Sequence, residues 1–196
     1  LQLRKWAREY QCPCDVLTCA NAAMNCHLGL LKWWARAYQC PCDMLTCANA
    51  AKNGHIELLK WARANPCPCD MWTCANAAKN GHLELLKWAR ANQCPWDQRT
   101  CSYAVENGQL ELLKWARAYQ CPCDMLTCAN AAKNGHLESL KWWARTYQWS
   151  CTMTTCSNAT TTGQIGFVSC SRANASPYAF WKSAHDQIYA TPMFLQ

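Results

Sequence analysis

Apolar residues are distributed along this chain with the period of α-helices. In the segment 56–65, Leu58, Leu59, Trp61 and Ala62 fall on one face, while charged residues occupy other positions. The pattern predicts a helix that buries one face and leaves the opposite face in water.

A second helix is predicted over 44–52, directly before the first. Asp43 stands at its start, where a carboxylate can accept hydrogen bonds from the free amide groups of the first turn. Gly54 stands beyond its end, where a left-handed backbone costs glycine little. Proline in the Cys-Pro-Cys segment at 67–69 stops the second helix. Together these signals predict a helix-turn-helix unit.

The unit recurs with a period of 27 residues. Each spacing of 28 coincides with a doubled Trp, at Trp33-Trp34 and Trp142-Trp143. A unit this short cannot bury both of its faces alone, so we expect neighbouring units to stack into an all-α solenoid of about six repeats. The repeated Thr-Cys pair marks the units, at Thr18, Thr46, Thr73, Thr100, Thr127 and Thr155.

The repeat pattern also predicts how the chain is divided. Residues 1–11 match the second half of a truncated unit, and residues 12–147 hold five repeats. Residues 148–175 match a degenerate sixth repeat. We expect 176–196 to be a degenerate seventh repeat or a C-terminal tail.

Composition narrows the class of protein. The chain has 196 residues, of which 51% are hydrophobic and 16% charged, so we expect a folded core and no disorder. Every apolar run is shorter than 18 residues, which predicts no membrane span.

The 18 cysteines raise the question of bridges. Equivalent cysteines of adjacent units would lie roughly 8–10 Å apart, beyond the distance of about 7 Å that a disulfide allows. Bridges between non-equivalent cysteines stay open. We interpret the cysteines as free, buried and apolar in character, which favours an intracellular, reducing compartment, with the cytoplasm as first candidate.

Metal and catalytic sites are not predicted. Cys40, Cys42, Cys47 and His55 are zinc ligands by type, but Cys47 and His55 would lie on the order of 12 Å apart along the predicted helix. The spacings of nucleophile, base and paired carboxylates that catalysis needs are missing from the sequence. We expect no metal, no cofactor and no enzymatic activity.

The formal net charge of +7 raises a nucleic-acid hypothesis. Lys60 and Arg63, with their counterparts in other units, form two basic rows that could follow phosphates. However, Glu57 and its counterparts stand three residues before each Lys and dilute that charge. We interpret the rows as a solvated outer face, with nucleic acid an unlikely partner.

The residues 43–60 resemble the helix-turn-helix of the ankyrin-repeat family, with the pattern Asp-x-x-Thr-Cys-Ala-Asn-Ala-Ala-Lys-Asn-Gly-His-Ile-Glu-Leu-Leu-Lys. The chain is most similar to a short Cys-Pro-Trp-Asp, Leu-Lys-Trp-Ala subtype common in giant viruses, algae and other protists. The resemblance covers residues 3 to about 174. It implies an ankyrin-like solenoid with shortened or absent β-fingers, protein binding and no catalysis.

The resemblance also implies that the first helix of each unit lines a concave side. Slots on this helix that vary between units are candidates for contact with a partner. We predict a non-catalytic scaffold that binds another protein through this face and has no small-molecule substrate. One alternative is a structural subunit of a larger multiprotein assembly, and a third hypothesis is a basic nucleic-acid-binding surface. The candidate contact residues are Met44, Met71, Trp72, Gln98, Arg99, Tyr103 and Met125.

Overall fold

The computed structural model describes residues 15–38, 42–147 and 153–161, and all regular structure within them is helical. The helices are α2 (Val16–Met24), α3 (Leu28–Tyr38), α4 (Met44–Lys52), α5 (Ile56–Ala64), α6 (Met71–Lys79), α7 (Leu83–Ala91), α8 (Gln98–Glu106), α9 (Leu110–Ala118), α10 (Met125–Lys133), α11 (Leu137–Tyr147) and α12 (Met153–Thr161).

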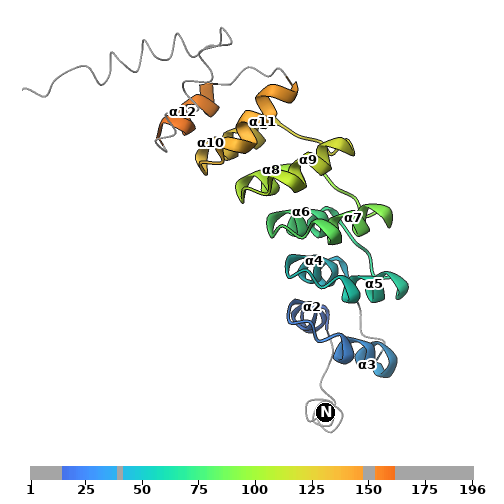
Figure 1. Ribbon diagram of the computed structural model, residues 1–196. Coiled ribbons are helices and arrows are strands. Elements are labelled where there is room, and N and C mark those ends of the chain that lie inside the picture. The colour runs from blue at the N-terminus through green and yellow to red at the C-terminus, as the bar shows by residue number, and fades with distance from the viewer. Residues whose placement is uncertain (1–14, 39–41, 148–152, 162–196) are drawn as a thin grey trace, which may run out of the picture.

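The helices pair into hairpins that stack into a curved solenoid (Figure 1). We call the first helix of each hairpin the A helix (α2, α4, α6, α8, α10 and α12) and the second the B helix (α3, α5, α7, α9 and α11). Each A helix packs extensively against the A helices of its neighbours, whereas each B helix packs mainly against its own A helix. The A helices therefore lie on the inner side of the bend. The predicted all-α solenoid is confirmed.

Local sequence signals set the ends of each hairpin. Asp43 Oδ1 accepts a hydrogen bond from the Thr46 amide at 3.1 Å and caps α4. Gly54 has φ +75° at the turn into α5. A Cβ atom at Gly54 would lie 2.9 Å from Cε1 of His82, in the next hairpin. Glycine is therefore required both by the backbone conformation and by the close approach of a neighbouring repeat.

The core consists of small residues on the A helices and larger ones on the B helices. Ala50 and Ala51 are fully buried, as are Leu58 and Leu59. The alanines let adjacent A helices approach closely, and Trp61 packs against the core from the B layer. This arrangement explains the inward bend, because the A layer is thinner than the B layer.

The repeated histidines join one hairpin to the previous one. His55 begins α5, but its side chain makes no capping bond there. Instead its Nε2 lies 3.2 Å from the carbonyl oxygen of Met24, at the end of the preceding A helix. His82 and His136 make the equivalent contact with Lys52 and Glu106, at 3.2 and 2.9 Å. The histidine side chains thus link each of these hairpins to the previous one.

Among the described residues, two disulfides close hairpins at their open ends. Cys42 is bonded to Cys67 around α4 and α5, and Cys69 is bonded to Cys94 around α6 and α7. The Cα atoms of each pair are 5.3 and 5.7 Å apart, because the B helix returns the chain to the start of its own A helix. We call these two bridges the hairpin staples.

The prediction of free cysteines is wrong for these four residues, since the pairing joins non-equivalent cysteines within one hairpin. It is confirmed for other cysteines that are unbridged and buried, namely Cys47, Cys74, Cys101 and Cys128. The expectation of a reducing compartment rested on free cysteines, and the staples weaken that support.

The hairpin of α8 and α9 has Trp96 in the slot of the first stapling cysteine. Its partner position, Cys121, is buried and unbridged, and the Cys121 thiol lies 3.6 Å from the Asp97 carbonyl oxygen. The Trp96 ring instead packs edge-on against Trp115, with centroids 5.9 Å apart. A covalent closure is thus replaced by aromatic packing.

Thiol reactivity in the native protein should follow burial. Burial raises the pKa of Cys47, Cys74 and Cys128 to about 12, whereas a hydrogen bond with the Cys101 thiol lowers the pKa of Cys123. Because the thiolate is the reactive form, iodoacetamide at pH 8 should modify Cys123 well before the three buried thiols. Peptide mass spectrometry over time measures this order, with urea-unfolded protein as the control. Early modification of Cys74 in folded protein would contradict the described packing.

Several predictions lie at the edges of what the structure covers. The predicted segments 1–11 and 176–196 lie outside the described residues, and only 153–161 of the predicted sixth repeat lies within them. The predicted division into repeats there stays a prediction. None of the described helices combines the length and apolar character of a membrane-crossing segment. Within the described ranges, no cluster of three or more metal-ligating side chains occurs.

Candidate functional site

The inner face of the solenoid is formed by three positions of each nine-residue A helix. The second, sixth and ninth residues lie within about 60° of one another around the helix axis. In α4, α6, α8 and α10 all of these residues are exposed or half-buried. We call this set the inner face: Leu45, Asn49, Lys52, Trp72, Asn76, Lys79, Arg99, Tyr103, Glu106, Leu126, Asn130 and Lys133.

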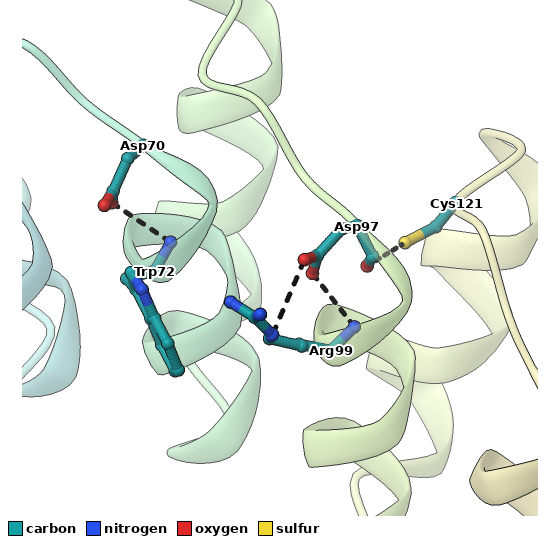
Figure 2. A network of polar contacts seen from close by, with 5 residues as sticks. All are labelled: Asp70, Trp72, Asp97, Arg99 and Cys121. Atoms are coloured by element: carbon teal, nitrogen blue, oxygen red, sulfur yellow. Dashed lines mark hydrogen bonds and ion pairs between the residues drawn. The ribbon is translucent and has the colours of Figure 1, made fainter.

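Capping aspartates hold the first turn of the A helices in the centre of this face. Asp70 Oδ1 accepts a hydrogen bond from the Trp72 amide, and Asp97 Oδ1 accepts one from the Arg99 amide, both at 3.0 Å. Figure 2 shows these two caps side by side, with the Arg99 side chain reaching from α8 toward Trp72 on α6. The two side chains are therefore presented from fixed backbone positions.

Trp72 and Arg99 form a cation–aromatic pair between adjacent repeats. The guanidinium Cζ of Arg99 lies 4.5 Å from the centre of the Trp72 ring, and Nε lies 3.7 Å from Asp97 Oδ2. The Trp72 residue is 40% exposed. An exposed indole beside a guanidinium offers both a stacking surface and hydrogen-bond donors.

A second pair follows the first along the same face. Lys79 Nζ lies 5.0 Å from the centre of the Tyr103 ring. The equivalent slot in other repeats holds asparagine, and Asn49 and Asn76 donate to the Ala20 and Ala48 carbonyl oxygens at 3.1 and 3.2 Å. Those asparagines join adjacent A helices, whereas Tyr103 brings an aromatic ring to the surface.

Lysine charge is distributed differently on the two sides of the solenoid. On the B helices, Lys60 is paired with Glu57 at 2.7 Å, and the counterpart pairs in α7, α9 and α11 are 2.7–2.8 Å apart. On the inner face, Lys52, Lys79 and Lys133 are exposed, and the ion pairs of the described chain do not involve them. The twelve residues of the inner face include four cations and one carboxylate, Glu106, so this set has a net positive charge.

The structure places the predicted contact residues in two groups. Trp72, Arg99 and Tyr103 belong to the inner face and lie in adjacent repeats. Met44, Met71 and Gln98 are exposed at the first position of their helices, about 100° around the axis from the second position. Met125 begins α10, but its side chain lies outside the described residues. These first-position residues therefore lie beside the inner face and not on it.

Lys52, Lys79 and Lys133 are not among the contact residues predicted from the sequence. The basic rows predicted from the sequence lie on the B helices, where the glutamates do neutralise the lysines. The sequence does contain a signal for these inner-face lysines, because the 27-residue period repeats lysine at the last position of the A helix.

Comparisons with known proteins give a fold likeness only. No family model and no curated protein matches the chain. Among solved structures, the chain is similar to the pentatricopeptide repeat protein PPR10 in complex with an 18-nt psaJ RNA element, and to a variant of that protein with three cysteine-to-serine substitutions in complex with the same RNA element. For both, the TM-score is 0.47 and the identity 15%. The matched region covers 91% of this chain and 28% of PPR10.

Two predictions are not supported by these comparisons. The expectation was a protein partner with nucleic acid unlikely, whereas both similar structures are complexes with RNA. The inner-face lysines, which no ion pair of the described chain involves, were not part of that expectation. No comparison identifies the ankyrin family, and the stacked helical hairpins show a helical repeat protein.

Proposed function

We propose that the chain is a non-catalytic repeat scaffold that binds single-stranded nucleic acid, RNA in the first place, along its inner face. The observation that carries this is the pairing of aromatic rings with cations in consecutive repeats: the exposed Trp72 with Arg99, and the half-buried Tyr103 with Lys79. Proteins that bind single strands combine such stacking surfaces with a positive groove that follows the backbone.

Each group on the inner face has a role in this proposal. Trp72 and Tyr103 stack on bases, which are accessible only where the strand is unpaired. Arg99 keeps donors for phosphate or base edges, because one guanidinium has five N–H groups. Lys52 and Lys133 neutralise phosphates on either side of the aromatic pairs. Glu106 interrupts the lysine row and marks a position where a phosphate is disfavoured.

We also infer that the repeats are a short ankyrin-like type. The support is local: an aspartate cap such as Asp43, a glycine turn such as Gly54 with positive φ, and a histidine directly after it. The 27-residue period and the absence of strands among the described residues fit a shortened finger.

The proposal predicts a salt-dependent affinity that depends on the inner lysines. For a fluorescently labelled single-stranded RNA, we expect log K to fall with log salt at about 0.7 per neutralised phosphate, or roughly 2.8 for four cations. The variant with Lys52, Lys79 and Lys133 all changed to Gln should lose about 2.1 of that slope. Fluorescence anisotropy at several salt concentrations measures both.

The chain offers a control with the same loss of charge. Changing Lys60, Lys114 and Lys141 to Gln removes three lysines that are paired with glutamates on the B helices, and it should change the slope little. Trp72→Ala should weaken binding by about 5- to 150-fold, the range for one stacked base. Equal losses in both triple variants would point to net charge alone and would overturn the inner-face proposal.

A further inference from the structure

The B layer holds a pocket between α7 and α9, on the opposite side of the molecule from the inner face. Its volume is about 660 Å³, and it is lined by Lys87, Arg90, Ala91, Trp115 and Tyr119. Small-molecule sites occupy roughly 300–1,000 Å³. We call it the outer pocket.

Aromatic rings form one wall of the outer pocket. Trp115 and Tyr119 lie one helical turn apart with ring centroids 4.8 Å apart, and Trp96 packs edge-on against Trp115 from behind. Tyr119 is 62% exposed, so its ring is accessible to a ligand. The wall depends on Trp96, which stands where other hairpins have a stapling cysteine.

Two cations form the opposite side, and each keeps free donors. Arg90 donates to the Cys94 carbonyl oxygen at 2.7 Å and stacks on Trp96, with Cζ 4.1 Å from the ring centre. These contacts hold the guanidinium in place and use one of its five N–H donors. Lys87 Nζ contacts Glu84 at 2.7 Å and remains 41% exposed, which leaves two of its donors.

The equivalent position one repeat earlier has different chemistry. There the slot of Tyr119 holds Asn92, whose Nδ2 donates to the Trp88 carbonyl oxygen at 2.8 Å. The slot of Arg90 holds Arg63, which is exposed and reaches the Asn92 carbonyl oxygen at 3.5 Å. That earlier position has neither the second ring nor the stacked arginine, so its residues provide matched substitutions.

From this arrangement we propose that the outer pocket binds a purine nucleotide. A planar base matches the accessible faces of Trp115 and Tyr119, and a phosphate matches the remaining donors of Lys87 and Arg90. A neutral aromatic ligand would leave the two cations unused. The nucleotide is either a free mononucleotide or the phosphorylated end of a strand, since both present the same base and phosphate.

The test uses ADP and a 5′-phosphorylated oligonucleotide as separate probes, with calorimetric titration for each. Tyr119→Asn places in the pocket the residue that the preceding repeat carries, so the hairpin keeps a known C-terminal contact. It should weaken binding by about 5- to 150-fold. Arg90→Ala should weaken binding by about tenfold or more, whereas Arg63→Ala should leave it unchanged. Circular dichroism confirms that each variant is folded.

The outcomes separate the two sources of ligand. ADP binding that Tyr119→Asn and Arg90→Ala weaken identifies a mononucleotide site. Binding of the phosphorylated oligonucleotide alone, with the same dependence on Tyr119 and Arg90, identifies a strand end. The proposal is overturned when neither probe, at concentrations up to millimolar, shows binding that Tyr119→Asn and Arg90→Ala weaken. The inner-face triple lysine variant should bind ADP normally, which keeps this test independent of the proposed function.

Discussion

Replacing Cys42 and Cys69 together by alanine should lower the free energy of unfolding by about 7 kcal/mol. Each hairpin staple closes a loop of sequence separation 25, and the loss of chain entropy in the unfolded state for a loop of that length is worth about 3.5 kcal/mol. Urea denaturation followed by circular dichroism measures the change. Wild-type protein treated with dithiothreitol should approach the stability of the variant.

Cys123 gives a matched control for this prediction. It occupies the same slot before an A helix, directly preceding Asp124, but it is unbridged. Cys123→Ala should therefore lower the free energy of unfolding by far less than the loss of a staple does. Combining it with the loss of a staple should not lower the free energy of unfolding much further. If dithiothreitol leaves wild-type stability unchanged while the double variant is destabilised, the cysteines stabilise by packing and the staple explanation fails.

Leu86→Ala should lower the free energy of unfolding by about 2–5 kcal/mol. Leu86 is fully buried in α7, and removing its side chain loses apolar contacts and leaves a cavity between hairpins. Because each repeat contacts only its neighbours, a defect in the centre of the array should also weaken the coupling of the flanking hairpins. Hydrogen exchange should then show α4 and α8 opening separately.

The control for Leu86 is an exposed leucine. Leu126 is 62% exposed at the first turn of α10, so Leu126→Ala should change stability by no more than about 0.5 kcal/mol. A cost below about 1 kcal/mol for Leu86→Ala would mean that the central interface can collapse around the lost side chain.

The hairpin was predictable because its determinants are local. The Asp43 cap, the turn at Gly54 and the helix over 44–52 follow from residues within one repeat, and the structure has them at the predicted positions. Helix α5 ends at Ala64, with Asn65 as its cap. The stacking of units also followed from one repeat, since a single hairpin exposes apolar residues on both faces.

The contacts between hairpin ends and between repeats were harder to predict. The bond from His55 to the Met24 carbonyl oxygen spans 31 positions, and nothing in the local pattern of His55 indicates it. The Cys42–Cys67 staple forms because the B helix returns the chain to the start of its own A helix. The distance between equivalent cysteines of adjacent repeats gives no information about this pairing. The pair of Trp72 and Arg99 involves a varying slot, and its proximity follows only when adjacent A helices are known to touch.

The staples also determine how the chain would respond to a pulling force applied at its two ends. Tension passes through the Cys42–Cys67 and Cys69–Cys94 bonds, so the hairpins that they enclose bear no load and cannot lengthen. Without its disulfide, each enclosed segment could add on the order of 80 Å to the length of the extended chain. The hairpin of α8 and α9, which has Trp96 in place of a stapling cysteine, lies on the load-bearing path. Under tension it should extend while the two stapled hairpins keep their length.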